Sequence, residues 1–300
     1  MSQTSYDAVI VGAGPAGLTA ALYMARFRRQ VLVIDGGDSR AAWIPETHNH
    51  PGFPEGVSGL DLLELQRRHA VRYGAQIRSG TVDALSSTGE GFSLSIDGET
   101  VLSPTVLLAC GVEDNEPALP GVERAVRQTL LRTCPICDGF EVIGKRVGVI
   151  GGDGLGAREA LFLQTYADQL TLIHAGAPDA LTADERDRLA RADITIVETP
   201  IESVELQIDR PRALCFSDSV RLEFDALYTA LGITPRTGLA LAIGAHHDES
   251  GRLVVDEHQQ TSIPGLYAAG DMVRGLNQIT TAQGEASIAA TAMHNRLRGC

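Results

Sequence analysis

Residues 8–17 read Ala-Val-Ile-Val-Gly-Ala-Gly-Pro-Ala-Gly, an apolar run followed by glycines at G-x-G-x-x-G spacing. A short apolar run that ends in such a turn is typical of a buried strand leading into a helix. Gly12 permits the tight turn, Gly14 lets the backbone approach a pyrophosphate, and Gly17 lets the helix pack on the strand. The stretch therefore predicts a dinucleotide-binding turn, with the pyrophosphate at the helix N-terminus.

The residues that follow complete a β-α-β unit. The turn extends from Gly12 through Pro15 and Ala16 to Gly17, a helix is expected to follow to about Arg28, and a second apolar strand, 31–34, ends at Asp35. An acid about twenty residues beyond the glycine turn is placed to accept hydrogen bonds from an adenosine ribose. A glycine-rich turn without a ligand is the alternative interpretation. The two flanking strands and the terminal acid favour a dinucleotide, and we include Gly36, directly after the acid, in the predicted site.

A second copy of this pattern lies in the middle of the chain. Residues 147–173 read as strand, glycine turn, helix and strand, after a linker at 113–121 that is acidic and contains prolines. Aligned without gaps, the second turn places Asp153 where a glycine is expected, and a carboxylate repels a pyrophosphate. A shift of one residue restores the glycine spacing over 152–157. The sequence leaves both alignments open, but it predicts an α/β protein with two nucleotide-binding folds.

Between the two copies, residues 133–139 read Thr-Cys-Pro-Ile-Cys-Asp-Gly. Cys134 and Cys137 at C-x-x-C spacing can cycle between a dithiol and a disulfide. At a helix start, the backbone N–H groups and the helix dipole lower the pKa of one thiol, and Pro135 suits the first turn of such a helix. Asp138 is placed to take or deliver the proton that thiol–disulfide exchange moves.

A zinc half-site and a pair of buried thiols are the alternatives for these cysteines. A structural zinc site needs two more ligands at similar close spacing. The remaining cysteines stand alone, and two histidine pairs have no matching partner motif: Cys110, Cys215, Cys300, His48/His50 and His246/His247. We therefore predict no metal and a redox role for the C-x-x-C pair.

The composition narrows the class of protein. The chain has 300 residues, 32 glycines, 44% hydrophobic residues and a formal net charge of −13. This negative charge argues against nucleic acid or an anionic membrane as partner and suits a cytoplasmic protein. The N-terminus lacks the charged region of a signal peptide, and no apolar stretch is long enough to cross a bilayer.

The other segments alternate between strands and helices. Residues 44–54 are rich in proline and glycine and predict a loop, and 76–108 predict strands. A helix is expected over 60–73, with its apolar side formed by Leu60, Leu63, Leu65 and Val71. Residues 189–231 predict short strands, 261–271 predict a strand that ends at a Gly-Asp pair, and 278–297 predict a helix.

Taken together, these residues resemble the low-molecular-weight thioredoxin reductase family over essentially the whole chain. Four motifs occur in the family's order: VGAGPAGL at 11–18, HNHPGFP at 48–54, CPICDG at 134–139 and TSIPGLYAAGD at 261–271. The resemblance implies a discontinuous FAD domain, 1–112 plus 243–300, with a pyridine-nucleotide-like domain inserted at 113–242. Both domains are expected to be Rossmann-like, each with three layers, two of strands and one of helices (ββα). Proteins of this family are usually homodimers.

The resemblance also implies roles for single residues. Asp271 is expected to contact the ribityl chain of the flavin, and Asn49 matches a loop residue that approaches the flavin. Cys137 is implied to face the flavin and Cys134 to attack the partner's disulfide. The full predicted cofactor-binding set is Gly12, Gly14, Pro15, Ala16, Gly17, Asp35, Gly36, Asn49, Val82, Gly111, Gly270, Asp271, Gln278 and Ile279.

One departure from the family concerns the electron donor. The family carries clustered arginines after the second strand of the inserted domain, where they grip the 2′-phosphate of NADPH. Here residues 174–181 contain none, and the first arginine is Arg186. Divergent branches with this pattern take electrons from ferredoxin or another donor, or work as dithiol oxidases that use oxygen.

The prediction is an FAD-dependent thiol–disulfide oxidoreductase that passes electrons between flavin and the C-x-x-C pair, and on to a thioredoxin-like protein or a small disulfide. NADPH is doubtful as its donor. A dithiol oxidase and a conventional NADPH-thioredoxin reductase are the alternatives.

Overall fold

The computed structural model describes residues 4–117, 122–206 and 212–299. The described residues form two compact units, one within the ranges Met1–Ala42, Val57–Glu113 and Thr234–Cys300, the other within Trp43–Gly56 and Asp114–Ile233. The end of the predicted linker, 118–121, and Cys300 lie outside the described residues. These units are defined by packing, and our division at residues 112 and 243 stays a prediction.

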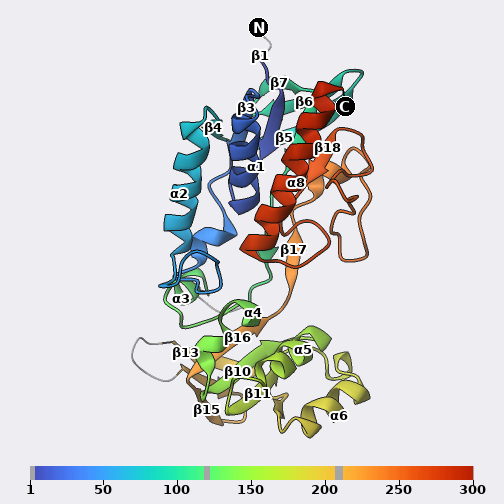
Figure 1. Ribbon diagram of the computed structural model, residues 1–300. Coiled ribbons are helices and arrows are strands. Elements are labelled where there is room, and N and C mark those ends of the chain that lie inside the picture. The colour runs from blue at the N-terminus through green and yellow to red at the C-terminus, as the bar shows by residue number, and fades with distance from the viewer. Residues whose placement is uncertain (1–3, 118–121, 207–211, 300) are drawn as a thin grey trace. The chain divides into compact units, whose positions relative to one another are not determined.

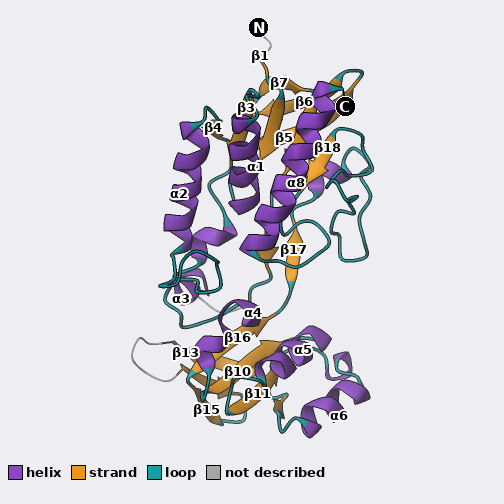
Figure 2. Ribbon diagram, in the orientation of Figure 1, coloured by secondary structure: helices purple, strands orange, loops and turns teal. Residues whose placement is uncertain are grey.

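A five-stranded parallel sheet forms the centre of the first unit (Figures 1 and 2). Its strands, in spatial order, are β18 (Leu266–Ala268), β8 (Thr105–Leu108), β2 (Ala8–Val11), β3 (Val31–Asp35) and β4 (Gln76–Ser79). Alternate residues of β2 enter different cores, Ala8 and Ile10 on one face and Val9 and Val11 on the other. The strand is apolar throughout because both faces of the sheet are covered.

Helices cover one face of this sheet and a second sheet covers the other, which gives three layers. The helices are α1 (Pro15–Arg26), α2 (Gly59–Arg72) and α8 (Ile279–Arg298). The second sheet has the order β1 (Thr4–Ser5), β7 (Glu99–Ser103), β6 (Gly91–Ile96) and β5 (Val82–Thr88). Short helical turns η1 (Arg40–Trp43) and α7 (Gly238–Leu241) complete the unit.

Helix α2 corrects one detail of the sequence-based prediction. Leu60, Leu65 and Val71 of the expected apolar side are exposed, whereas Leu62 and Ala70 are buried and Leu63 is partly buried. The helix itself begins as expected, because the Ser58 hydroxyl accepts a hydrogen bond from the Asp61 N–H. Because α2 has apolar residues on two sides, periodicity alone predicted the wrong side to be buried.

The second unit repeats the arrangement around a four-stranded parallel sheet. The strand order is β12 (Thr195–Val197), β11 (Gln169–His174), β10 (Arg146–Gly151) and β16 (Ala226–Ala230). An antiparallel sheet packs on one face, formed by β13 (Ile201–Glu205), β14 (Arg212–Phe216) and β15 (Arg221–Phe224), and α5 (Gly154–Leu163) packs on the other. The predicted fold class, two Rossmann-like domains with one inserted into the other, is confirmed.

Sequence patterns missed two helices of this unit, α3 (Val122–Arg127) and α6 (Ala183–Arg191). The start of α6 does carry a signal, a reciprocal capping box between Thr182 and Glu185. Strands β9 (Val112–Asp114) and β17 (Ile233–Pro235) pair where the chain passes from one unit to the other. Within the described ranges, no helix has the length and apolar character that crossing a bilayer requires.

Candidate active site

The first glycine turn connects β2 to α1 through a close backbone contact. Gly12 has a φ of +110°, and a Cβ there would lie 2.2 Å from the Ala109 carbonyl oxygen. A Cβ on Gly17 would lie 1.8 Å from the Gly12 carbonyl oxygen, so only glycine lets the helix approach the turn this closely. Gly14 differs, because a Cβ there would meet only the Ser39 hydroxyl, at 3.4 Å. The space above Gly14 is therefore not filled by the fold.

The parallel strands bring several predicted site residues to one edge of the sheet. Gly12, Asp35 and Gly270 lie at or just beyond the carboxyl ends of β2, β3 and β18 of the same parallel sheet. Gly270 has a φ of +84°, and a Cβ on it would lie 3.2 Å from the Ala16 Cβ. The Gly-Asp turn after β18 thus reaches the first turn of α1, although the two are far apart in the sequence.

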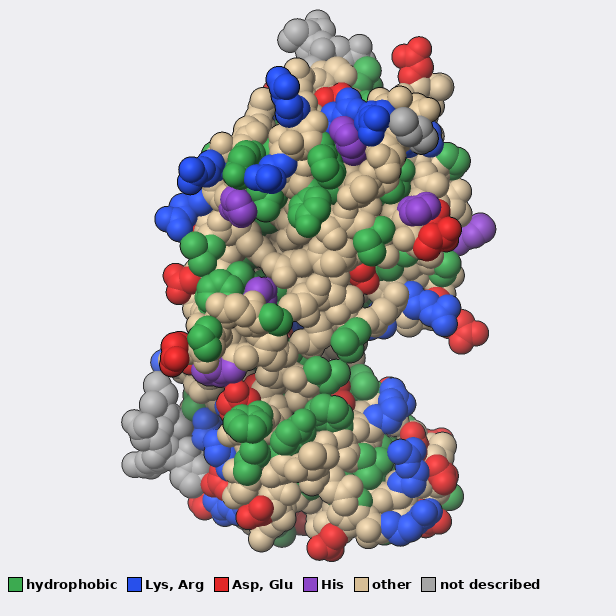
Figure 3. Space-filling model, viewed as in Figure 1, with side chains coloured by type: hydrophobic (Ala, Val, Ile, Leu, Met, Phe, Trp, Pro, Cys, Tyr) green, Lys and Arg blue, Asp and Glu red, His purple; other side chains and the backbone are tan. Residues whose placement is uncertain are grey.

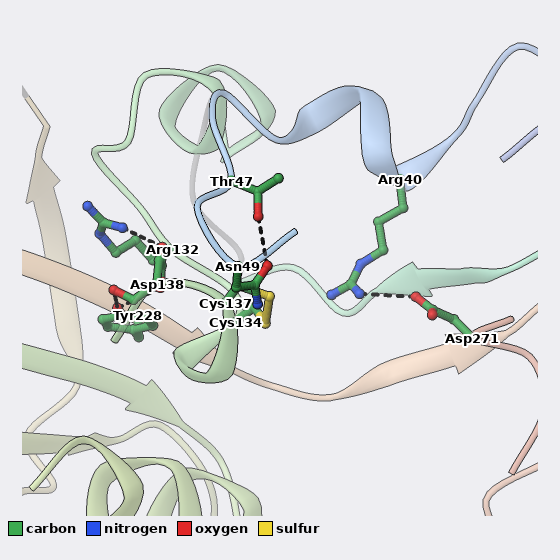
Figure 4. The surroundings of a disulfide bond; sticks show 9 residues. All are labelled: Arg40, Thr47, Asn49, Arg132, Cys134, Cys137, Asp138, Tyr228 and Asp271. Atoms are coloured by element: carbon green, nitrogen blue, oxygen red, sulfur yellow. Dashed lines mark hydrogen bonds and ion pairs between the residues drawn. A yellow bond between two sulfur atoms is a disulfide. The ribbon is translucent and has the colours of Figure 1, made fainter. Parts of the chain in front are cut away.

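Both acids at this edge have basic partners. Asp35 accepts a hydrogen bond from the Gly37 N–H at 2.9 Å and pairs with Arg67 of α2. Asp271 pairs with Arg40 of η1 at 3.2 Å (Figure 4). A carboxylate has about four lone-pair positions, so one that pairs with an arginine can also accept a hydrogen bond from a ribose or ribityl hydroxyl.

The residues of this edge fit an FAD. Gly14 is the N-cap of α1 and supplies no side-chain hydrogen bond to it, which leaves the first N–H groups of the helix for a pyrophosphate. The amide oxygen of Asn277, two residues before the start of α8, is buried without a hydrogen-bond partner among the described residues. A buried polar group of this kind is expected to meet a ligand or water.

Other members of the predicted set are more dispersed. Gly36 follows β3, Gly111 lies between β8 and β9, and Gln278 caps α8, whose first residue is Ile279. Val82 begins β5 and is buried in the core between the two sheets. Their contacts with a cofactor stay a prediction.

In the second unit, Cys134 and Cys137 form a disulfide with their Cα atoms 5.3 Å apart. Cys134 is the N-cap of α4 (Pro135–Asp138), and Pro135 is its first residue, as the sequence predicts. Figure 4 shows the surroundings of this disulfide, among them Thr47 and Asn49 of the loop that packs with this unit. The Thr47 hydroxyl donates a hydrogen bond to the Asn49 side-chain oxygen at 2.8 Å. The predicted contact of Asn49 with flavin stays a prediction.

Asp138, the last residue of α4, is held by two side chains (Figure 4). The Tyr228 hydroxyl donates to its Oδ1 at 2.7 Å, and the Arg132 guanidinium pairs with its Oδ2. Burial raises the pKa of the Asp138 carboxyl above its ordinary value, while Arg132 and Tyr228 oppose that rise. Burial and the nearby carboxylate raise the pKa of Tyr228 as well, so its hydroxyl remains a hydrogen-bond donor.

The remaining described cysteines lie in different surroundings. Burial raises the pKa of the Cys110 thiol to about 11, so this residue behaves as a small apolar side chain. The Cys215 sulfur lies 3.9 Å from Glu205 Oε1. No group of three or more His, Cys, Asp or Glu side chains suited to a metal occurs among the residues that the structure describes.

The second glycine turn resolves the alignment that the sequence left open. Strand β10 ends at Gly151 and α5 begins at Gly154, with Asp153 as its N-cap, just as Gly14 is the N-cap of α1. The gap-free alignment is therefore correct, and Asp153 stands where the first turn has Gly14. Its carboxylate accepts a hydrogen bond from the Leu155 N–H at 2.8 Å. The N-terminus of α5 is thus capped by an anion of the protein itself.

Comparison with known proteins identifies the family of this chain. A family model described as pyridine nucleotide-disulphide oxidoreductase matches residues 6–286. The chain belongs to this family.

Within it, the chain is similar to the thioredoxin reductase of Mycolicibacterium smegmatis, with 33% identity over 300 residues that cover 96% of each protein. The thioredoxin reductase of Streptococcus pyogenes superposes with a TM-score of 0.91 at 25% identity and full coverage of both chains. The protein HlmI gives a TM-score of 0.91 at 30% identity, over 98% of this chain and 93% of that one. The chain is a thioredoxin reductase-like flavoprotein disulfide oxidoreductase, and its family implies FAD.

Sequence reasoning missed three polar residues of this disulfide oxidoreductase: Arg40, Arg132 and Tyr228. Arg132 lies two residues before the C-x-x-C motif, a position that could have drawn attention to it. Arg40 and Tyr228 carried no local signal, because their partners are 231 and 90 residues away in the chain.

Proposed function

We propose that bound FAD and the Cys134–Cys137 pair exchange two electrons, and that the reduced pair then reduces a thioredoxin-like protein or a small disulfide. The observation that carries this proposal is the disulfide at the start of α4 with a held carboxyl group, Asp138, at its end. FAD, when bound, supplies a carrier that accepts or gives electron pairs. The chain's own residues supply the thiols and move the proton.

In the proposed exchange, the dithiol form reacts in two steps. Asp138 takes the proton of Cys134 as that sulfur attacks the partner's disulfide, which forms a mixed disulfide, and it passes this proton to the partner thiolate that leaves. Cys137 then loses its proton and attacks the Cys134 sulfur, which restores the internal disulfide; the second partner sulfur leaves as a thiolate and takes up the proton that Cys137 lost. The partner is reduced by two electrons, and the pair is oxidised by two.

Exposed apolar side chains around α4 support a protein partner. Phe140 is 75% exposed, and Ile136 and Ile143 are also exposed. Figure 3 shows hydrophobic side chains gathered on this face of the second unit, over α4 and α5. Large exposed apolar groups that flank a reactive disulfide favour a partner that covers them during exchange.

We further propose a donor other than NADPH, such as ferredoxin or a dithiol. The carboxylate of Asp153 caps the helix at which a pyrophosphate would bind, and Gly176 packs so closely that a Cβ there would lie 1.8 Å from the Gly152 carbonyl oxygen. Arg186, the first arginine beyond β11, pairs with Glu198 at 2.7 Å. These features favour exclusion of a polyanion from the second turn.

The test is an anaerobic titration of the purified yellow protein with NADPH, NADH and dithiothreitol, followed by flavin absorbance. We expect dithiothreitol to bleach the flavin through the cysteine pair, and NADPH to act slowly and with no advantage over NADH. Rapid bleaching by micromolar NADPH would refute the donor proposal and favour a conventional NADPH-thioredoxin reductase. In a second assay under air, rapid turnover of a dithiol with oxygen, without reduction of any disulfide partner, would favour the dithiol oxidase.

A homodimer is also proposed. The outer side of α2 presents Leu60, Leu65 and Val71 to solvent, and Tyr23 of α1 is exposed as well. An apolar helix surface of this kind is a candidate for contact with a second copy. Light scattering on the FAD-loaded protein measures its mass, and a mass of one chain at micromolar concentration would refute the dimer.

A further inference from the structure

The backbone segments that carry Arg132 and Tyr228 are hydrogen-bonded to each other, and the side chains of both residues contact Asp138. The two residues form an isolated parallel bridge. The Arg132 N–H donates to the Leu227 carbonyl at 2.9 Å, and the Thr229 N–H donates to the Arg132 carbonyl at 2.8 Å. The segment just before the C-x-x-C motif is therefore registered against β16. This register fixes the origin of both side chains that reach Asp138.

Each oxygen of the Asp138 carboxylate receives one donor. Tyr228 donates to Oδ1 at 2.7 Å and lies 3.2 Å from the Asp138 carbonyl, and Arg132 pairs with Oδ2. A carboxylate has about four lone-pair positions, so positions for a proton remain. The carboxyl group is thus fixed in orientation while it keeps the capacity to exchange a proton.

Stability does not explain this arrangement. Tyr228 is fully buried, and the Arg132 and Asp138 side chains are only 15% and 25% exposed. Ion pairs withdrawn from water are often no more stabilising than apolar residues of the same volume. Charges of the same sign also lie near each member of the pair. Glu141 of η2 (Gly139–Val142) repels Asp138, and Arg212 of β14 repels Arg132. A role in the reaction accounts better for the free-energy cost of withdrawing these charged groups from water.

We infer that Arg132 and Tyr228 are positioning residues that hold the Asp138 carboxyl for proton exchange with the Cys134–Cys137 pair. The inference rests on the proposed function. Both residues stabilise the ionised carboxylate, which is the form that accepts the Cys134 proton. Without either donor, Asp138 keeps its proton to higher pH, and the acidic limb of the exchange reaction moves to higher pH.

The test uses the full-length protein with FAD, reduced by dithiothreitol and freed of it anaerobically. Its reaction with 5,5′-dithiobis(2-nitrobenzoate) is followed by stopped flow from pH 5 to 9. Asp138→Asn is expected to slow exchange on the order of 100-fold and to move the acidic limb up to the pH range in which the Cys134 thiol ionises by itself. Tyr228→Phe and Arg132→Gln are each expected to slow it about tenfold on that limb, and Arg132→Lys, which keeps the charge, to recover part of the rate.

Two controls separate positioning from folding. Tyr166→Phe removes a hydroxyl from another ring of the same unit, one that packs against Gly139, and is expected to leave the pH profile unchanged. In the Asp138→Asn background, Tyr228→Phe should have no further effect, because its action passes through the lost carboxyl. Thermal melts verify that each variant is folded.

An acidic limb that stays in place in folded Tyr228→Phe and Arg132→Gln would overturn the inference. A full additional loss in the double variant would overturn it as well. If the unmodified reduced protein does not react with the disulfide at all, the proposed function fails. The pH profile of thiol alkylation by iodoacetamide then decides the inference by itself. An acidic limb that both Asp138→Asn and Tyr228→Phe move to higher pH would still support the inference, and a limb that neither variant moves would overturn it.

Discussion

Gly14 and Gly17 lie three residues apart in one turn, yet we expect alanine at each to cause a different defect. At Gly17 the added Cβ would lie 1.8 Å from the Gly12 carbonyl oxygen, so α1 and β2 would have to separate by more than an ångström. Both sides of this contact are backbone, and neither can turn away. We expect Gly17→Ala to destabilise the FAD-free protein by about 3 kcal/mol, the upper part of the usual range for overpacking, or about 6–12 °C in melting temperature.

At Gly14 the added Cβ would meet only the Ser39 hydroxyl, at 3.4 Å, and the backbone φ of −76° suits alanine. We therefore expect Gly14→Ala to lower the stability of the FAD-free protein by no more than about 1 kcal/mol, mainly from a poorer N-cap. Its methyl group would occupy the space for the pyrophosphate. Loss of one charge-assisted hydrogen bond is worth about 1.5–3 kcal/mol, which corresponds to roughly 10- to 150-fold weaker FAD binding.

The assay measures two quantities for each variant: the melting temperature of the FAD-free protein by circular dichroism, and FAD affinity by flavin fluorescence. Gly284→Ala is the matched control, because this exposed glycine of α8 has open space around its Cβ and no positive φ. It should leave FAD affinity unchanged and slightly raise stability. Equal melting losses in Gly14→Ala and Gly17→Ala, or unchanged FAD affinity in folded Gly14→Ala, would refute the reasoning.

Three further predictions concern the cysteines, the flavin edge and the core. Cys134→Ser should leave a thiolate at Cys137 that gives long-wavelength absorbance with oxidised FAD, whereas Cys137→Ser should not show this absorbance. The same spectrum and turnover in both variants would contradict the redox assignment. Asp271→Ala should release FAD more readily on dilution, with roughly 10- to 150-fold weaker affinity, because a hydrogen bond to a charged group is lost; unchanged retention, measured by filtration, would remove this residue from the site. Leu62→Ala should cost about 2–5 kcal/mol in urea unfolding, since Leu62 is 3% exposed, whereas Leu65→Ala at 41% exposure should cost less than about 1 kcal/mol; the reverse order would contradict the packing of α2.

The sequence by itself determined the parts of this protein that depend on local patterns. Glycine spacing within ten residues predicted both glycine turns between a strand and a helix, apolar runs predicted the strands that flank them, and C-x-x-C spacing predicted the disulfide between Cys134 and Cys137. These inferences hold because a tight turn, a short strand or a disulfide of neighbouring residues is decided by the few residues that form it. Four motifs in order then sufficed for the family, and the comparisons confirmed it.

Local patterns were less informative where the same stretch of sequence is compatible with more than one structure. Helix α2 has apolar residues on more than one side, so the choice between Leu62 and Leu65 as the buried residue depended on what packs against the helix. The second glycine turn allowed two alignments, and only the positions of β10 and α5 showed that Asp153 is the N-cap. In both cases the deciding contact comes from another element.

Only the tertiary structure decided which distant side chains meet. Arg40 reaches Asp271 because η1 and the turn after β18 lie at the same edge of a parallel sheet. Tyr228 reaches Asp138 because β16 is registered against the segment that carries Arg132. Strand order and register are properties of the whole sheet, set by the burial of all its strands together. For this reason the sequence predicted the thiols and the acid of the candidate site, while the residues that hold the acid emerged only from the folded chain.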